Sequence, residues 1–309
     1  MKSQPASSRP VLYSVISLTS AALLLTACGA NTDPLEEGDG ETTAGEDAIV
    51  IGSQAYYSNE IVAEIYAQAL EAEGFDVERE FQIGQREVYM PELEGGEIDL
   101  LPEYTGNLVQ YYQDEAETGS PEAVHSQAQD VLPDGLQVLD WAEATDQDSY
   151  VVTSETAQEH ELESIGDLTN LGDSVTMAAN SEFEARPYGP DGAQELYGVT
   201  VEVVGVEDSG GPLTVSALVD GDVDVADIYT SSPAIAAEDL VILDDPEHLI
   251  LPQNVVPVAS EDLDDQAVEV INTVQADLTA DDLVELNTRS VDDQASSDDV
   301  AQEWLENRE

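Results

Sequence analysis

Short apolar runs alternate along this chain with stretches whose apolar residues recur at helical spacing. Ala48 to Ser53 reads AIVIGS, which is typical of a short buried strand. The next stretch predicts a helix that begins at Ser58 or Asn59, with that residue as its N-cap, and stops at Gly74. One face of this helix carries Ile61, Val62, Ile65, Tyr66, Ala69 and Leu70. A strand, a Gly-Ser turn and a helix form a β-α unit.

The same alternation continues downstream. Further strands are predicted at 175–179, 199–204, 223–226 and 240–243, and helices at 122–132, 192–196 and 266–278. Strands that alternate with helices indicate an α/β fold with parallel sheets covered on both faces. The roughly 260 residues after Asp47 are long for one such sheet, so we expect two lobes.

A separate apolar run lies near the start of the chain, from Val11 to Ala27, after the basic residues Lys2 and Arg9. A membrane span needs about 20 apolar residues, and this run is shorter. A basic start, an apolar middle and small residues at the end are typical of a secretory signal peptide. Its end, Leu25-Thr26-Ala27-Cys28-Gly29, resembles the bacterial lipobox, in which cleavage precedes a cysteine that receives a diacylglyceryl group. We expect a signal peptide at 1–27 and lipidation of Cys28. An ordinary signal peptide that happens to contain a cysteine is the alternative.

Residues 28–47 predict an acidic tether, because they are rich in Gly, Thr, Asp and Glu and poor in apolar side chains. The acyl chains on Cys28 would hold the folded part at the outer face of the cytoplasmic membrane. Cys28 is the only cysteine, so the sequence excludes an internal disulfide and a cysteine metal cluster.

The charge of the chain narrows the classes of partner. Its formal net charge is −61, from 68 acidic and 7 basic residues, and Lys2 is its only lysine. Nucleic-acid binding needs clustered Lys and Arg, so we expect no nucleic-acid partner. Apolar residues make up 41% of the chain and recur periodically, which favours a folded domain with an acidic surface suited to salty surroundings. A specific cation-binding role for the acids is the alternative.

Two segments share the pattern L-x-x-G-[DE]-[IV]-D-[LV]-x-x-x-Y-T, at 93–105 and at 218–230. Each predicts a helix end, a glycine turn, a buried strand and then a tyrosine, Tyr104 or Tyr229. Ligands of open α/β sheets bind beyond the carboxyl ends of strands, so these tyrosines are expected on facing edges of a cleft. Chance similarity is the alternative. A calcium loop at Asp220, Asp222 and Asp224 is excluded, because the sixth-position glycine and the bidentate glutamate are missing.

Tyrosine dominates the aromatic residues, with 12 Tyr against 3 Phe and 2 Trp. Tyr104, Tyr150, Tyr188 and Tyr229 fall at predicted turns rather than on apolar faces. Converging tyrosine rings suit a quaternary ammonium group, which cannot donate hydrogen bonds and is attracted to ring faces. For any single tyrosine, partly buried packing is the alternative.

Several segments resemble the substrate-binding proteins of osmoprotectant ABC transporters, which capture glycine betaine, choline, carnitine and related quaternary amines. The segments are 49–53 (IVIGS), 96–100 (GEIDL), 102–106 (PEYTG), 148–152 (DSYVV), 182–186 (EFEAR), 227–230 (DIYT) and 252–257 (PQNVVP). The resemblance covers nearly all of 48–309, and PEYTG is its most specific element. It implies a type II periplasmic-binding-protein fold, with a ligand cleft between two lobes joined by a two-stranded hinge.

The resemblance also implies roles for individual residues. An ammonium cage would use Tyr104, Tyr150 and Tyr229, while Asn107 and Arg186 would hold the other end of the ligand, typically a carboxylate. Glu182, one helical turn before Arg186, would line the pocket, and Gln54, Gln253 and Asn254 complete the expected site. Arg186 as a surface charge paired with Glu182 at i,i+4 is the alternative.

Two positions depart from the family pattern. Gln54 replaces a common lysine, which favours a less anionic ligand such as choline, and Gln253 replaces an aromatic residue, which would leave the cage open on one side. Tyr56, Tyr57 or Tyr188 would then close it.

The expected mechanism is capture by hinge closure and delivery to an ABC permease and its ATPase. Lobe I would comprise 48–148 and 251–309 and lobe II 149–250, in a monomer that needs no cofactor or metal. An exported enzyme is disfavoured, because no nucleophile elbow, phosphate loop or H-E-x-x-H motif occurs and the three histidines lie far apart in sequence. A two-lobed lipoprotein that acts as a sensory or surface-interaction module is the other alternative.

Overall fold

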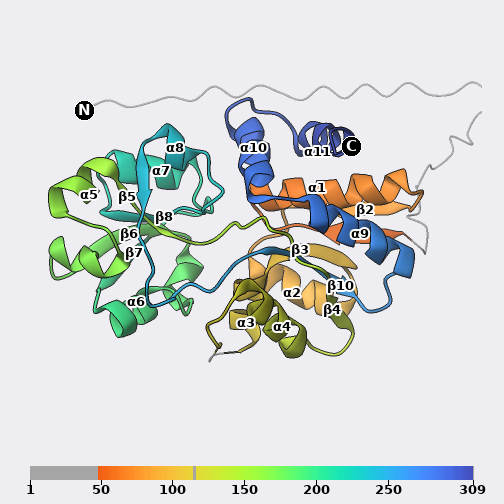
Figure 1. Ribbon diagram of the computed structural model, residues 1–309, viewed down its shortest axis with the longest axis horizontal. Helices are drawn as coiled ribbons and strands as arrows, with labels where there is room; N and C mark the ends of the chain where they lie inside the picture. Colours follow the sequence, from red (N-terminus) through yellow and green to blue (C-terminus); the bar gives the residue numbers. More distant parts are fainter. Residues whose placement is uncertain (1–47, 114–115, 309) are drawn as a thin grey trace, which may run out of the picture. The chain divides into compact units, whose positions relative to one another are not determined.

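The computed structural model describes residues 48–113 and 116–308, which lie within one unit, Ala44–Glu309. They form two five-stranded sheets with helices on both faces (Figure 1). The predicted signal peptide at 1–27, Cys28 and the predicted tether at 28–47 all lie outside the described residues. Among the described helices none has the length and apolarity that crossing a membrane requires.

The first sheet has the strand order β2-β1-β3-β10-β4. Its strands are β1 (Ile49–Gly52), β2 (Val77–Glu80), β3 (Leu100–Tyr104), β4 (Leu136–Val138) and β10 (Val255–Ser260). β1 pairs in parallel with β2 and β3, whereas β10 runs antiparallel to β3 and β4.

The second sheet has the order β7-β6-β8-β5-β9. Its strands are β5 (Tyr150–Thr153), β6 (Val175–Ala179), β7 (Val201–Gly205), β8 (Val225–Asp227) and β9 (Leu240–Ile242). β6 is parallel to β7 and β8, and β5 is antiparallel to β8 and β9. The expectation of purely parallel sheets is therefore wrong. Each sheet contains one reversed strand, β10 in the first and β5 in the second. Each of these strands directly follows a segment that crosses from the other sheet.

Helices cover both faces of the first sheet (Figure 1). One face packs on α1 (Tyr57–Ala72), α9 (Asp265–Asp277), α10 (Ala280–Val291) and α11 (Ser297–Glu306), and the other on α2 (Arg86–Gly95), α3 (Thr105–Tyr112) and α4 (Pro121–Val131). Alternate residues of β10 supply the two cores, Val255 and Ala259 on one side and Val256 and Val258 on the other.

The second sheet is covered in the same way. One core includes residues of α5 (Ser154–His160), α6 (Pro190–Tyr197) and the 3₁₀ turns η1 (Ile165–Asn170) and η2 (Ser181–Ala185). The other includes residues of α7 (Pro212–Val219), with Ile235 of α8 (Ala234–Ala237) packed against it. Two five-stranded α/β sheets thus form lobes I and II, for which the limits 48–148 with 251–309 and 149–250 stay a prediction.

The predicted helix after β1 exists, and its predicted apolar face is buried in the first core. The predicted cap is wrong, since Tyr56 occupies the N-cap position and makes no side-chain cap. Asn59 instead accepts a hydrogen bond from the Gln54 N–H at 2.8 Å and donates to the Pro102 carbonyl at 2.8 Å. These bonds fix the β1–α1 turn against β3.

The repeated sequence pattern corresponds to repeated structure. In both copies a helix ends at a left-handed glycine, Gly96 or Gly221, and a strand follows. The aspartate side chains of the pattern accept equivalent bonds at 2.8 Å, Asp99 from the Val50 N–H and Asp224 from the Thr176 N–H. The pattern therefore ties β3 to β1 and β8 to β6, and it brings Tyr104 to the end of β3 and Tyr229 just beyond the end of β8.

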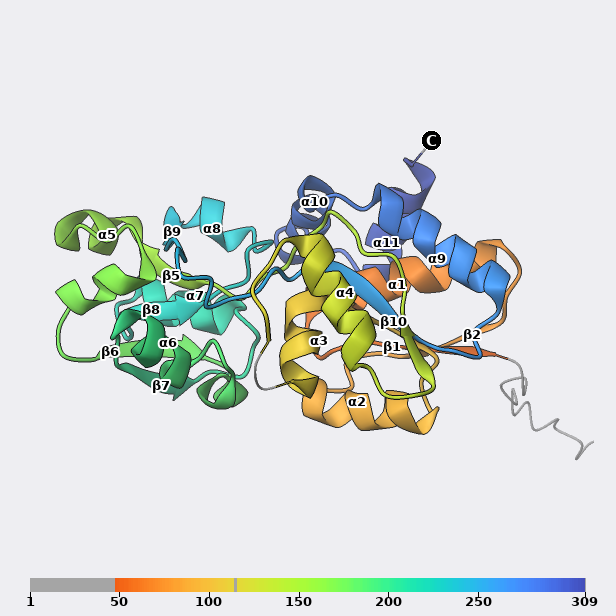
Figure 2. The same ribbon diagram turned by 60° about the horizontal axis from the view of Figure 1, so that its bottom comes forward.

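Two chain segments cross between the sheets, one from β4 to β5 and one from β9 to β10 (Figure 2). They pair with each other at Thr145 and Asn254. The Val255 N–H donates to the Ala144 carbonyl at 2.9 Å, and the Asn254 side chain donates to the Ala142 carbonyl at 3.0 Å. The crossings thus form the two-stranded hinge expected of this fold.

Candidate ligand-binding site

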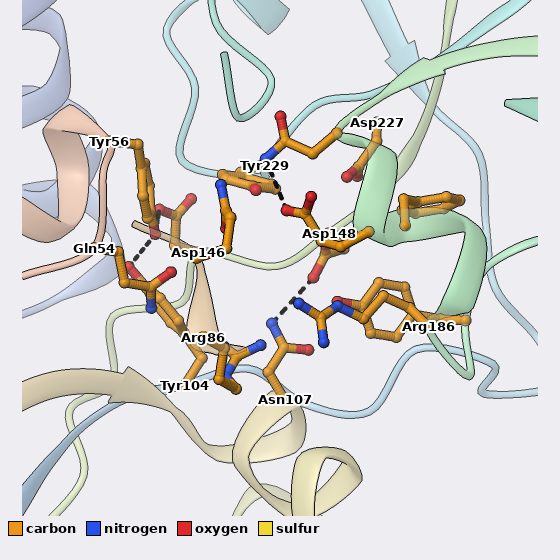
Figure 3. A pocket seen from close by; sticks show the side chains of 15 residues that line it. Gln54, Tyr56, Arg86, Tyr104, Asn107, Asp146, Asp148, Arg186, Asp227 and Tyr229 are labelled. Atoms are coloured by element: carbon orange, nitrogen blue, oxygen red, sulfur yellow. Dashed lines mark hydrogen bonds between the residues drawn. The ribbon is translucent and has the colours of Figure 1, made fainter. Parts of the chain in front are cut away.

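A cavity lies between the two lobes, next to the hinge (Figure 3). Its volume is about 30 Å³. The lining side chains are polar or aromatic: Gln54, Tyr56, Gln85, Arg86, Tyr104, Asn107, Asp146, Asp148, Asn180, Glu182, Phe183, Arg186, Tyr188, Asp227 and Tyr229. Of the residues predicted for the site, the structure brings Gln54, Tyr104, Asn107, Glu182, Arg186 and Tyr229 together in this lining.

Three tyrosines from both lobes meet at one end of the cavity. The rings of Tyr56 and Tyr104 have centroids 6.5 Å apart, and those of Tyr56 and Tyr229 have centroids 5.4 Å apart. The hydroxyls of Tyr56 and Tyr104 bond each other, and Tyr56 also donates to Asp146 at 3.1 Å. Burial raises the pKa of all three hydroxyls, with a further rise from neighbouring acidic groups. The rings are therefore those of neutral phenols at physiological pH.

A second aromatic group lies toward lobe II. Phe183 packs edge-on between Tyr150 and Tyr188, at centroid distances of 6.0 and 5.7 Å. Of the three tyrosines predicted as candidates to close the cage, Tyr56 and Tyr188 line the cavity and Tyr57 does not. Tyr150 is fully buried, donates its hydroxyl to the Tyr188 carbonyl at 2.8 Å and lies outside the lining. Its place in a cage stays a prediction, while its observed contact supports the backbone at Tyr188.

The first arginine of the lining, Arg86, forms a buried ion pair with Glu103. Its Nε and Nη2 donate to the two Glu103 oxygens at 2.7 and 2.9 Å. Glu103 also accepts from the Tyr89 hydroxyl at 2.5 Å and from the Tyr104 N–H at 2.9 Å. The glutamate of PEYTG thus neutralises Arg86 and fixes the start of α3.

The second arginine, Arg186, also pairs with a glutamate. Its Nη1 and Nη2 donate to the two Glu87 oxygens at 2.7 and 3.3 Å, which joins lobe II to the first turn of α2 in lobe I. Partial burial of Glu87 acts to raise its pKa, but hydrogen bonding from Arg186 keeps the pKa of Glu87 below its usual range. The pairing of Arg186 with Glu87 was not apparent from the sequence, because 99 residues separate the two positions.

The expected helical stacking of Glu182 and Arg186 is wrong. Glu182 lies in η2, a 3₁₀ turn that ends at Ala185, and Arg186 has extended backbone angles. A 3₁₀ turn has three residues per turn, so positions i and i+4 are not aligned. Glu182 accepts a hydrogen bond from Asn180 at 3.0 Å instead.

Three aspartates concentrate negative charge in the site. Asp148 and Asp227 face each other beside Tyr229, and Asp146 lies behind Tyr56 (Figure 3). Burial raises the pKa of Asp227, and the neighbouring Asp148 raises it further. Burial also raises the pKa of Asp146, opposed by hydrogen bonds from Ser231, Ser58 and Tyr56. A bound cation would offset this unfavourable burial of carboxylates.

Asn107 is held by an amide and carboxylate network. It donates to Asp148 at 3.1 Å and accepts from the Gln253 side chain at 2.8 Å, while the Gln253 oxygen accepts from the Asp148 N–H at 2.9 Å. Gln253 is fully buried behind Asn107, and Asn254 is used in the hinge, so neither lines the cavity. The expectation that Gln253 leaves a cage wall open therefore does not apply to this cavity, and ligand contact by either residue stays a prediction.

Gln54 has a side-chain nitrogen without a partner. The residue is 6% exposed and lines the cavity, and its Nε2 makes no hydrogen bond. A buried unsatisfied donor is unfavourable, so this amide is available to a ligand oxygen.

Sequence reasoning did not assign Arg86, Asp146, Asp148 or Asp227 to the site. A signal existed for two of them, because Asp148 and Asp227 each stand two residues before a tyrosine in the segments that carry the family resemblance. Arg86 and Asp146 had no comparable local pattern. Within 48–113 and 116–308, no group of three His, Cys, Asp or Glu side chains could hold a metal ion.

Comparisons with known proteins place this geometry in context. Residues 47–307 match the family model for the substrate binding domain of the ABC-type glycine betaine transport system. Glycine betaine-binding protein YehZ of Escherichia coli (strain K12) is 24% identical over 275 residues, which cover 84% of this chain and 90% of that protein.

Two solved structures share the fold. A glycine betaine/carnitine/choline ABC transporter protein matches with TM-score 0.68 and 21% identity, over 84% of this chain and 97% of its own. Lactococcal OpuAC, closed and complexed with glycine betaine, matches with TM-score 0.62 and 14% identity, over 85% of this chain and 96% of its own. The predicted type II periplasmic-binding-protein fold is confirmed.

Proposed function

Because the chain belongs to the family of substrate-binding domains of ABC-type glycine betaine transport systems, we propose that it captures a quaternary ammonium compound between its lobes. The family serves transport rather than catalysis. The ligand is of the glycine betaine or choline type, and the ligand-bound form delivers it to a membrane permease driven by an ATPase.

The observation that carries this proposal is the convergence of tyrosine rings and carboxylates on one cavity. Tyr56 and Tyr104 come from lobe I and Tyr229 from lobe II, so a cation held among them would contact both lobes. Each ring face contributes about 0.5–2 kcal/mol to cation binding, the higher value when the cation is desolvated. Asp148 and Asp227 add charge attraction within the same space.

The size of the cavity supports capture by hinge motion. The cavity is small, about 30 Å³, and its lining comes from both lobes, so separation of the lobes would open it to a ligand. The paired crossings at Thr145 and Asn254 are the natural hinge. Ligand contacts to both lobes then favour the closed state.

The beginning of the chain supports a location outside the cytoplasm. The proposed signal peptide at 1–27, lipidated Cys28 and tether at 28–47 would keep a monomeric receptor beside its permease. Globomycin-sensitive processing of the full chain and metabolic labelling with a fatty acid test this part. Substitution Cys28→Ala should abolish labelling, and labelling that persists would contradict it.

The test of ligand binding is calorimetric titration of the purified folded part with choline and with glycine betaine. Tyr229→Ala is expected to weaken binding of the preferred compound by about tenfold or more, through loss of one desolvated ring face. Tyr229→Phe keeps the ring and is the matched control, because within 48–113 and 116–308 the Tyr229 hydroxyl has no hydrogen-bond partner. Equal affinity of Tyr229→Ala and the unmodified protein would overturn the cage.

A further inference from the structure

The cavity holds more negative than positive charge, and both of its positive groups are already paired. Its carboxyl groups are Asp146, Asp148, Glu182 and Asp227, and its guanidinium groups are Arg86 and Arg186. Arg86 is neutralised by Glu103 and Arg186 by Glu87, neither of which is a lining residue. The remaining lining charge is therefore acidic.

The two arginine pairs differ in exposure. The Arg86 and Glu103 side chains are 6% and 0% exposed, and Arg86 donates to both Glu103 oxygens, so its charge is already neutralised inside the protein. The Arg186 and Glu87 side chains are 15% and 51% exposed, which places this pair at the rim of the cavity. Arg186 is the more exposed guanidinium of the lining and therefore the one accessible to a ligand carboxylate.

Glu87 already occupies that guanidinium as a ligand carboxylate would. Its two oxygens accept from Nη1 and Nη2 of Arg186 in the side-by-side arrangement typical of arginine and carboxylate. A zwitterionic ligand would have to displace Glu87 or add a further carboxylate to an acidic site. A ligand whose other end is neutral leaves the pair intact, and the free Nε2 of Gln54 can donate to its oxygen.

We propose that Glu87 is a specificity-determining residue that substitutes for a ligand carboxylate on Arg186. The site accordingly prefers a quaternary ammonium ligand with a neutral oxygen, such as choline, over one with a carboxylate, such as glycine betaine. This inference rests on the proposed function, since it concerns the same cavity. Glu87 acts through Arg186 and needs no contact with the ligand.

The experiment compares dissociation constants of choline and glycine betaine, measured by calorimetry in one buffer of fixed salt concentration. The unmodified protein is expected to bind choline at least about tenfold more tightly. Glu87→Gln frees the charge of Arg186, so the betaine-to-choline ratio of dissociation constants is expected to fall by about tenfold, mainly through tighter betaine binding.

Glu97→Gln is the matched control, because Glu97 is an exposed acid just after the same helix and takes part in no ion pair of the described residues. It removes the same charge and should leave the ratio unchanged. In an Arg186→Gln background, Glu87→Gln should also leave the ratio unchanged, which a purely structural role of Glu87 would not produce. Thermal unfolding of each variant verifies that it is folded.

The outcomes separate the two proposals. If the unmodified protein binds a quaternary amine but prefers glycine betaine, or if Glu87→Gln leaves the ratio unaltered, the role of Glu87 is refuted and the proposed function stands. If the folded protein binds neither compound, the proposed function fails and the role of Glu87 fails with it.

Discussion

Asp227 shows how a single residue in the cavity couples folding to proton binding. It is buried at the end of β8 and accepts from the Ser149 N–H at 3.2 Å. Asp148 faces it from the hinge and Glu182 from η2, so its carboxylate gains negative neighbours on folding. The folded protein therefore binds a proton at Asp227 more readily than the unfolded chain does.

This difference predicts a pH dependence of stability. Below about pH 4 both states hold the proton, and above it the unfolded chain releases it first. The free energy of unfolding should therefore fall as pH rises from about 4 through the raised pKa of Asp227. Asp227→Asn keeps an acceptor for Ser149 and should flatten this fall relative to the exposed control Asp222→Asn, as measured by urea unfolding across pH. Parallel pH profiles of the two variants would contradict it.

At the scale of elements, the start of α2 links both lobes to the site. Arg86, the first residue of the helix, reaches Glu103 in β3, and Glu87 reaches across to Arg186. Gln85, just before the helix, donates to Ser209 of lobe II at 3.3 Å. One helical turn thus fixes Tyr104 through Glu103 and also contacts the facing lobe.

Breaking the Arg86 pair should be costly. Glu103→Gln leaves a buried guanidinium without a counter-charge, which is expected to lower the free energy of unfolding by about 3–5 kcal/mol. Replacing both partners, as Arg86→Met with Glu103→Gln, removes the buried charge and should cost less than Glu103→Gln alone. Denaturant titration measures both. A double variant as unstable as the single one would show that charge compensation is not the cause.

The whole molecule is dominated by its acidic charge. The net charge is −61, and every described arginine forms an ion pair. Repulsion among the remaining carboxylates destabilises the compact state, and salt shortens its range from about 10 Å at 0.1 M to about 3 Å at 1 M.

Salt should therefore stabilise this protein at neutral pH. The midpoint of thermal unfolding is expected to rise between 0.1 M and 1 M NaCl, because screening relieves repulsion more than it weakens the few ion pairs. Near pH 4, where many carboxylates are protonated, the same increase in salt should have a much smaller effect. An equal rise at both pH values would point to a general salt effect instead.

The sequence by itself determined the features that depend on local pattern. Helical and strand periodicity gave the α/β units, and the repeated pattern located Tyr104 and Tyr229, because a strand end and the residue beyond it are set by a few neighbouring positions. The PEYTG segment and the other matching segments indicated the family, and the family resemblance predicted the two-lobed fold.

The tertiary structure alone decided which partners meet. Arg186 pairs with Glu87 from 99 residues away rather than with nearby Glu182, and Gln253 lies behind Asn107 rather than in the cavity. The reversed strands β5 and β10 likewise follow from crossings between lobes. Such contacts join residues far apart in sequence, so no local spacing encodes them, and they determine the charge that the cavity presents to its ligand.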